Sequence, residues 1–484
     1  MDRKLIFDKP PTSYNNTDFF PPSLPKINNA EEIIPNEFLR KELPLPSLGE
    51  LDVVRHYTNL SRLNFSVDAN FYPLGSCTMK YNPKLNEDIA QKNEFLLLHP
   101  YQNEEYIQGA LEVMYELNRI LCEITGMDQF SFQPSAGAHG ELTGMFMIKS
   151  FYSLNKEKRY KVIIPDSAHG TNPASSAMCG YETVVVKSTP SGLVDIDELR
   201  KKTDSTVAAM MLTNPNTLGL FEEQILEISE ILHKKGALLY YDGANFNALM
   251  GIAKPSLMGF DVIHLNLHKT FSTPHGSGGP GAAAVGVTKK LYDFLPVPVV
   301  DKKENKLYLK YDIKHTIGKV KSFYGNFLVI LKAYIYLLRI GREGIKRVAY
   351  NSVLNANYIK EKLKNYYTPA SEKKCMHEVV FSCIKQKNRG ASALDIAKRL
   401  IDFGIHPPTM YFPLIVKEAL MVEPTETESK STLDNFIKVM IEIDKEIDTN
   451  IEKLKKAPST TPVGRVNETK AARFPCLRWE KSGE

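Results

Sequence analysis

A lysine in the middle of the chain stands where a covalent cofactor could be held. The stretch HLNLHKTFSTPHGSGGPG, residues 264–281, places Lys269 at the end of an apolar run and before a glycine-rich turn. Open α/β sheets bind ligands at strand ends, and a turn without side chains lets a ligand approach the backbone. An ε-amine in that position could form a Schiff base with an aldehyde cofactor such as pyridoxal phosphate (PLP), whereas most lysines are simply solvated.

PLP chemistry also requires a carboxylate and a phosphate site, and both have candidates. Asp242 ends the apolar run ALLYYD and could keep the cofactor's ring nitrogen protonated, although Asp-Gly also forms ordinary turns. Ser135 and Gly137 lie in PSAGAHGE, which reads as a glycine turn opening a helix. Backbone N–H groups at a helix start bind phosphate, but a plain N-cap explains the same residues.

Two further loops could complete such a site. His169, in DSAHGTNP, could stack on the cofactor ring, although a lone loop histidine is more often solvated. Asn214 or Asn216, in TNPNT, could reach the phenolic oxygen of the cofactor, although Asn-Pro is first a turn signal. The order of these parts along the chain is typical of PLP enzymes with the aspartate aminotransferase fold, which this chain resembles.

A second glycine pattern would indicate a different cofactor, but the sequence around it does not fit that cofactor. Gly276, Gly278 and Gly281 satisfy G-x-G-x-x-G, the dinucleotide fingerprint. That fingerprint needs a helix to open on its last glycine. The following AAAVGV reads as a strand, so a nicotinamide site is not expected.

The elements that must position these residues can be read from apolar patterning. Short apolar runs without in/out alternation are typical of strands buried on both faces, and they predict a mainly parallel sheet wrapped by helices. These runs are KVIIPD at 161, ETVVVK at 182, TVAAMMLT at 206, ALLYYDG at 237, DVIHLNL at 261 and AAAVGV at 282. Helices are expected at 107–121 and 327–340, a short sheet near 377, and a late helix with an apolar stripe from Phe436 to Leu454.

The expected fold class is the α/β, aspartate aminotransferase-like fold type I of PLP-dependent transferases, with a large, mainly parallel seven-stranded sheet domain and a smaller C-terminal α+β domain. We expect an extended arm and first helices at 1–90, the large PLP-binding domain at 91–315 and the small domain at 316–484. The first fifty residues hold eight of the 29 prolines, so this arm is expected to be disordered or to wrap around another surface.

Composition excludes several classes of function. The chain has 484 residues, 43% of them hydrophobic, and a formal net charge of +5 with both signs interspersed. We therefore expect no nucleic-acid or membrane partner. The six cysteines are scattered without C-x-x-C, and the start MDRKLIFDK has no apolar signal core. A cytoplasmic protein without a disulfide framework or metal site is expected.

Longer stretches resemble one family, the glycine decarboxylases, which are the PLP-containing P proteins of the glycine cleavage system. The matching stretches are PLGSCTMKYNP at 73, QPSAGAHGE at 133, DSAHGTNPAS at 166, TNPNTLGLFE at 213, NLHKTFSTPHGSGGPG at 266, EPTETES at 423 and PVGRVNETKAARFPCLRW at 462. The likeness runs from about residue 50 to 480, and Ala284, where proline is more usual, is one small departure. The length and the lysine motif resemble subunit 2 of the two-subunit form.

The resemblance implies roles for individual residues. Lys269 would carry the Schiff base, with His169 as the second catalytic residue, stacked on the ring. Cofactor contacts would come from these two residues together with Ser135, Ala136, Gly137, Asn216, Asp242, Ala244 and His268. Cys77 would lie near the site entrance, although a buried apolar cysteine is an equal alternative.

The resemblance also implies the reaction and the partners. Glycine would bind as an external aldimine, lose its carboxylate as CO2 and pass the aminomethyl group to the lipoyl group of H protein. Two copies each of subunits 1 and 2 would form a heterotetramer. Two alternatives stay open at this point: another PLP enzyme of the same fold that works alone, and a binding or regulatory subunit without chemistry.

Overall fold

The computed structural model describes residues 5–10, 33–40 and 45–479, which form two compact units. One unit combines residues 1–66 with 459–484, and the other is Val67–Pro458. The first contains α1 (Glu50–Ser61) and α14 (Glu468–Arg473). Much of the predicted arm, at residues 1–4, 11–32 and 41–44, lies outside the described residues. No helix in the described part of the chain is long and apolar enough to cross a membrane.

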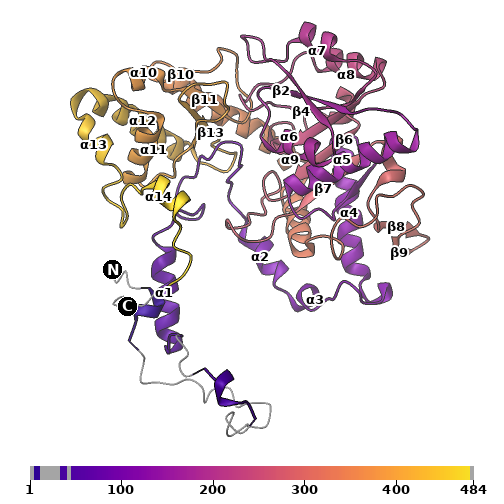
Figure 1. Cartoon of the computed structure of the whole chain (residues 1–484), viewed down its shortest axis with the longest axis horizontal. Coiled ribbons are helices and arrows are strands. Elements are labelled where there is room, and N and C mark those ends of the chain that lie inside the picture. The colour runs from indigo at the N-terminus through magenta and orange to yellow at the C-terminus, as the bar shows by residue number, and fades with distance from the viewer. Residues whose placement is uncertain (1–4, 11–32, 41–44, 480–484) are drawn as a thin grey trace. The chain divides into compact units, whose positions relative to one another are not determined.

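A seven-stranded sheet forms the centre of the larger unit, with strand order β1-β7-β6-β5-β4-β2-β3 (Figure 1). Strands β3, β2, β4, β5 and β6 are mutually parallel, β7 pairs antiparallel with β6, and β1 pairs antiparallel with β7 at the edge. Every residue of β4, β5 and β6 is buried, as expected of strands covered on both faces. The strands are β1 (Gln129–Ser131), β2 (Lys161–Pro165), β3 (Glu182–Val186), β4 (Val207–Thr213), β5 (Leu238–Gly243), β6 (Val262–Asn266) and β7 (Ala283–Val287).

The six apolar runs that predicted strands are confirmed as β2 to β7. The three-residue β1 and the hairpin of β8 (Val299–Lys303) and β9 (Lys306–Lys310) were not predicted. Because β7 begins at Ala283, the glycine turn opens on a strand and the dinucleotide fingerprint fails in the structure as well.

Helices in the first part of this unit precede or connect the strands, and those from residue 108 onward pack on the sheet (Figure 1). The helix predicted at 107–121 is confirmed as α4, which extends to Thr125 and stops because Gly126 takes a left-handed conformation, with φ 76°. The helices are α2 (Lys84–Ala90), α3 (Asn93–Leu96), α4 (Gln108–Thr125), α5 (Gly137–Leu154), α6 (Thr171–Met178), α7 (Ile196–Lys202) and α8 (Ile225–Lys234).

The long helix α9 (Phe327–Leu363) packs into two apolar cores. The sequence predicted its first half, and Gly341, at φ 60° and ψ −176°, breaks the helical conformation there. Ile330 and Leu337 join the core beside the large sheet, whereas Ala356 and Ile359 join the core of the C-terminal part. The domain boundary predicted at 315/316 stays a prediction.

The C-terminal part contains an antiparallel four-stranded sheet, in the order β10-β11-β13-β12, covered by helices. The late apolar stripe spans two helices rather than one, because Asn450 leaves the helical conformation between α12 and α13. The elements are β10 (Thr368–Pro369), β11 (Val379–Ser382), α10 (Ile384–Asn388), α11 (Ala393–Asp402), β12 (Thr409–Met410), β13 (Ala419–Val422), α12 (Lys430–Thr449) and α13 (Ile451–Lys456). The described residues from 459 to 479, which the sequence grouped with this part, belong to the smaller unit.

Candidate active site

Asp242 and His264 form the buried floor of the site. Strands β5 and β6 are parallel neighbours whose register places these residues side by side, so both side chains lie on one face of the sheet. His264 Nε2 lies 3.2 Å from Asp242 Oδ1, and Asn172 Nδ2 donates to Asp242 Oδ2 at 3.1 Å. The backbone N–H of Ala244 also donates to Asp242 Oδ1, at 3.1 Å.

These donors decide the charge of the carboxylate. Burial alone raises the pKa of Asp242, but His264, Asn172, Ala244 N–H and the Lys269 charge together bring that pKa below its ordinary value. Burial lowers the pKa of His264, so this imidazole is neutral near pH 7. The Tyr240 hydroxyl lies 2.8 Å from His264 Nδ1 and donates to it, because the other ring nitrogen carries the hydrogen that faces Asp242.

Lys269 lies just beyond the end of β6, half-buried, with its ammonium held by a backbone carbonyl. Its Nζ donates to Ser76 O at 2.8 Å, and its backbone N–H donates to Asn266 O at 3.1 Å. The charge of Lys269 contributes to the pKa shifts of both Asp242 and His169. The structure therefore brings Lys269, Asp242 and His169 into one electrostatic neighbourhood.

The start of helix α5 lies against the end of β6. Ala136 is the extended N-cap residue and Gly137 is the first helical residue. A Cβ on Gly137 would lie 2.2 Å from Asn266 Oδ1, so only glycine allows this approach. Asn266 Oδ1 is buried and has no hydrogen-bond partner within the described chain. Ser135 stands just before this turn, where its N–H donates to His139 Nδ1 at 3.2 Å.

His169 is an exposed side chain at the carboxyl end of β2. Its Nδ1 contacts the Thr171 hydroxyl at 2.9 Å, and its ring meets Phe412 edge-on, with 5.8 Å between ring centroids. Although part of the side chain is exposed, the protein around the ring excludes enough water to lower the pKa of His169; Asp242 opposes this effect and Lys269 adds to it.

The side chains of Asn216 and Asn214 form hydrogen bonds with backbone groups of the protein. Asn216 accepts from the N–H groups of Leu218 and Leu220 and donates to Gly192 O. Asn214 Oδ1 accepts from Glu222 N at 2.9 Å. These contacts use both lone pairs of Asn216 Oδ1 and one of the two N–H groups of its amide, and its role as a cofactor contact stays a prediction.

His268 packs against the glycine turn. Its Nδ1 lies 3.2 Å from Ala282 O, and a Cβ on Gly281 would lie 2.8 Å from that nitrogen. Gly281 therefore has to lack a side chain because His268 packs against it. Burial lowers the pKa of His268 to about 4, and the Lys269 charge contributes.

A cavity of about 190 Å³ opens beside Lys269. Its walls come from the glycine turn and from residues 72–80, and they include His268, Ser272 and Thr78. Cys77 lies in this wall, half-buried, as the resemblance suggested, and is not part of an apolar core.

Several residues of the site escaped the sequence analysis. Glu141 is 1% exposed, and burial together with Asp242 raises its pKa to about 7. Asn172 lies three residues after His169 in DSAHGTNP, but among asparagines the sequence predicted only Asn214 and Asn216 as cofactor contacts. His264 could have been predicted, because His264 and Asn266 lie two residues apart on β6 and so share one face of the sheet. Ser76 lies far away in the chain, and no local pattern links it to Lys269.

Comparisons with family models agree with this architecture. Residues 141–279 match the aminotransferase class-V family, and residues 348–464 match the glycine dehydrogenase C-terminal domain. The first match contains His169, Asp242 and Lys269.

Close relatives cover almost the whole chain. It is 59% identical over 453 residues to a probable glycine dehydrogenase (decarboxylating) subunit 2 of Caldanaerobacter subterraneus subsp. tengcongensis, covering 93% of each chain. It is 56% identical over 459 residues to the protein of the same name from Thermotoga maritima, covering 94% of this chain and 96% of that one.

Solved structures share the fold at lower identity. A glycine decarboxylase (P-protein) of the glycine cleavage system in inhibitor-bound form superposes with a TM-score of 0.73 at 20% identity, over 86% of this chain and 95% of that chain. A cysteine desulfurase from Thermococcus onnurineus NA1 gives 0.61 at 15% identity, over 78% and 95%. These likenesses confirm the fold class expected from the sequence.

Proposed function

The chain belongs to the glycine dehydrogenase (decarboxylating) subunit 2 family, and from this premise we propose how its residues divide the work of the reaction. It is a PLP-dependent glycine decarboxylase subunit of the glycine cleavage system. The designation subunit 2 implies a partner subunit 1. The alternatives of an enzyme acting alone and of a subunit without chemistry have no support in these comparisons.

The residues present fit PLP. A lysine amine, a buried ionised carboxylate and the N-terminus of an 18-residue helix lie around the ends of β5 and β6. Asn266 Oδ1, buried and without a partner in the described chain, faces the glycine that opens this helix. Such a set can hold a phosphate, a protonated pyridine nitrogen and an aldehyde carbon at the same time.

When bound, PLP supplies an electron sink for the electron pair left on the α-carbon as the carboxylate departs as CO2. Lys269 anchors the cofactor covalently through Nζ and takes part in proton transfer there. Asp242, oriented by His264 and Asn172, accepts the proton-bearing ring nitrogen as its hydrogen-bond partner. His169 would contact the cofactor ring.

The remaining contacts are proposed from position. The backbone N–H groups of Ala136 and Gly137, with the Ser135 hydroxyl, bind the phosphate at the start of α5. His268 orients this end of the cofactor from beside Lys269. Ala244 supports the site by donating its backbone N–H to Asp242. Asn216 stabilises the loop at the carboxyl end of β4.

We propose lipoylated H protein as the acceptor of the aminomethyl group and two copies of each subunit as the assembly. The first follows from the family's chemistry, in which a carrier arm must reach the cavity beside Lys269, and the second from the resemblance to the two-subunit form of the family. We also propose that the enzyme works in the cytoplasm, since its cysteines are all free thiols.

The position of Lys269 at the end of β6, beside Asp242 at the end of β5, carries the proposal. Borohydride reduction of the PLP-loaded protein followed by mass spectrometry should locate a pyridoxyl adduct on Lys269. With subunit 1 and lipoylated H protein present, the enzyme should exchange labelled bicarbonate into the carboxyl group of glycine.

Lys269→Ala should abolish the adduct and lower the exchange rate at least about 1000-fold, because the covalent anchor is lost. Lys289→Ala, which removes an exposed lysine just after β7, is the control and should leave both unchanged. An adduct on another lysine, or exchange that survives Lys269→Ala, would contradict the assignment.

A further inference from the structure

Two buried glutamates hold the loop that covers Lys269. Ser76 and Thr78 both adopt left-handed backbone conformations, with φ 63° and 45°, which are unfavourable for residues other than glycine. The N–H of Ser76 donates to Glu378 Oε2 at 2.8 Å, and the N–H of Thr78 donates to Glu423 Oε2 at 3.1 Å. Each strained residue therefore has its own carboxylate acceptor.

The two glutamates come from the C-terminal part of the chain, and both are fully buried. Glu378 directly precedes β11 and Glu423 directly follows β13. Both are 0% exposed, and one oxygen of each lies within 4.8 Å of the other. Two ionised carboxylates so close together in a dry environment repel each other strongly.

Their hydrogen bonds differ in a way that assigns the charge. Glu423 accepts from Thr78 N–H, from the Thr78 hydroxyl at 2.6 Å and from Asn247 Nδ2 at 3.4 Å. Glu378 accepts from Ser76 N–H, and its Oε1 is buried with no hydrogen-bond partner in the described chain. A buried carboxylate anion needs several donors, whereas a neutral carboxylic acid tolerates fewer.

The surrounding charges lead to the same assignment. The ionisable neighbours are Lys269, Lys80, Glu426, His377 and the Cys77 thiol. Burial lowers the pKa of His377 to about 3 and raises that of Cys77, so both are neutral near pH 7. Two lysine cations then face three glutamates, and the charges cancel if one glutamate carries a proton.

We propose that Glu378 is a neutral carboxylic acid and Glu423 an anion, and that this acid–anion pair is a positioning device for the 75–78 loop. By holding Ser76 and Thr78 in strained conformations, the pair sets the Ser76 carbonyl against the Lys269 ammonium, 2.8 Å away. Glu378 and Glu423 touch the loop rather than the reacting atoms, so both are positioning residues. Only the link to catalysis, through Lys269, rests on the proposed function.

The pair makes the loop sensitive to pH. Burial and the Glu423 charge raise the pKa of Glu378 well above its ordinary value, whereas the Thr78 donors and the Lys269 charge oppose the effect of burial on the pKa of Glu423. A raised pKa in the folded protein means that the stabilisation is complete at acidic pH and is lost as pH rises through the raised value. The hold on the loop should therefore weaken towards alkaline pH, as a second negative charge develops.

Two measurements on the full-length protein before PLP is added, in which the Lys269 amine is free, test the proposal without relying on turnover. Infrared difference spectra between wild type and Glu378→Gln at neutral pH should contain one carbonyl band of a protonated carboxylic acid. Amide hydrogen exchange of peptides spanning residues 73–80 should show protection that falls with rising pH in the wild type. Glu378→Gln should keep this protection at all pH values, because its amide mimics the protonated acid.

Glu378→Ala should speed exchange in this segment at least tenfold, since the Ser76 N–H loses its acceptor; should it fail to fold, Glu378→Gln still decides the question. Glu372→Gln, at an exposed glutamate nearby, should change nothing. The proposal is overturned if no acid band is lost in Glu378→Gln, or if that variant loosens the loop as much as alanine does. It is also overturned if elemental analysis finds one tightly bound metal ion per chain that is lost in Glu378→Gln, because a cation held with His377 would then replace the proton.

These readouts separate this inference from the proposed function. An enzyme that shows no bicarbonate exchange, but has the acid band and the pH-dependent loop, contradicts the function alone. Normal exchange in an enzyme without the acid band contradicts the acid–anion pair alone.

Discussion

At the scale of single residues, Asp242 stays ionised in the interior through the hydrogen-bond donors beside it and the Lys269 charge. His264 and Asn172 each direct an N–H at the carboxylate, and Tyr240 holds His264 in the tautomer that can donate. Donors that are already fixed in place need no rearrangement when a cationic ring nitrogen arrives opposite them. The chain Tyr240–His264–Asp242 therefore prepares the site for a charged heterocycle.

Asp242→Asn removes the negative charge and keeps the shape. A hydrogen bond to a charged group contributes about 1.5–3 kcal/mol, so the bicarbonate exchange rate should fall about 10- to 100-fold. The covalent adduct on Lys269 should still form, because its anchor is intact. Unchanged exchange in Asp242→Asn would mean that another group faces the ring nitrogen.

His264→Leu tests how the charge of Asp242 is maintained. Without the imidazole N–H, burial prevails and the pKa of Asp242 rises. A depressed carboxyl pKa keeps the ionised form down to low pH, so raising it should move the acid limb of the exchange profile to higher pH. The pH–rate profile measures this shift, and Tyr240→Phe, which retains the donor to Asp242, should move the limb less.

Residues that combine a local motif with a strand end could be predicted from the sequence. Lys269 and Asp242 end apolar runs, and the structure places them together at one edge of the sheet. His264 was missed because a histidine inside a buried strand has an ordinary structural explanation. Glu378 and Glu423 could not be assigned to this site, since each lies more than 100 residues from Lys269 and only tertiary packing brings them close.

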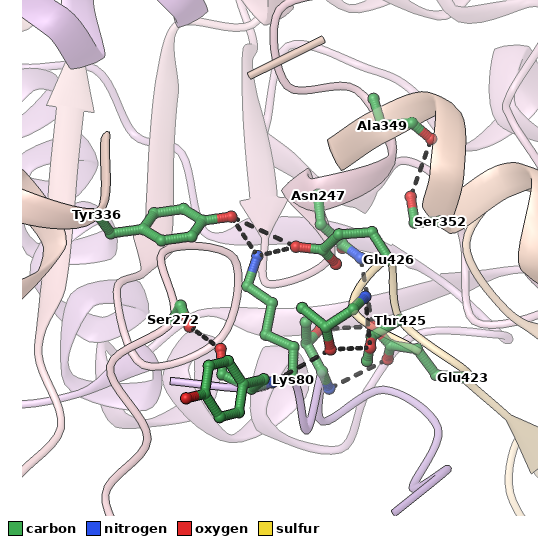
Figure 2. Close-up of polar contacts among 12 residues, drawn as sticks. Lys80, Asn247, Ser272, Tyr336, Ala349, Ser352, Glu423, Thr425 and Glu426 are labelled. Atoms are coloured by element: carbon green, nitrogen blue, oxygen red, sulfur yellow. Dashed lines mark hydrogen bonds and ion pairs between the residues drawn. The ribbon is translucent and has the colours of Figure 1, made fainter. Parts of the chain in front are cut away.

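At the scale of elements, the segment 73–82 is fixed by an ion pair deep in the protein. Figure 2 shows the Lys80 ammonium between the hydroxyl group of Tyr336 on α9 and the carboxylate of Glu426, at 3.1 and 2.6 Å. The Lys80 and Glu426 side chains are 1% and 7% exposed. Burial alone lowers the pKa of Lys80, but Glu426 and Tyr336 raise it above its ordinary value.

Lys80→Met should lower the free energy of unfolding by about 3–5 kcal/mol, because it leaves Glu426 as an unpaired buried charge. The matched control is Lys84→Met. Lys84 pairs with Asp68 at the same 2.6 Å, but both side chains are more than half exposed, so the loss should be about 0–1 kcal/mol. Urea unfolding of the two variants measures the difference, and equal losses would contradict the interpretation.

Elements with long apolar patterns could be predicted, and short ones could not. Strands β4 and β5 are buried along their full length and carry a strong signal. Strand β1 has only three residues and is held in the sheet by its pairing with β7. No local sequence pattern indicates this pairing. The break of α9 at Gly341 needs a single φ value, and a glycine in a helical pattern does not by itself specify it.

At the scale of the whole molecule, the smaller unit presents an apolar surface. On α1, the side chains of Leu51, Val54, Tyr57 and Leu60 are exposed and recur every three residues, so each lies next to the following one in a row that winds around the helix. We refer to these four residues as the α1 stripe. Exposed apolar faces of this kind are typical of protein contacts, and the family designation supplies a second subunit as the partner.

Replacing the four residues of the α1 stripe with serine should weaken assembly with subunit 1 before it affects chemistry, because Lys269 and Asp242 belong to the other compact unit. Sedimentation of the mixed subunits should show a dissociation constant at least tenfold larger than that of the wild type, while the pyridoxyl adduct forms normally. Substituting Thr58 and Asn59, exposed polar residues of the same helix, with alanine is the control and should leave assembly intact. Unchanged assembly of the stripe variant would show that subunit 1 binds elsewhere.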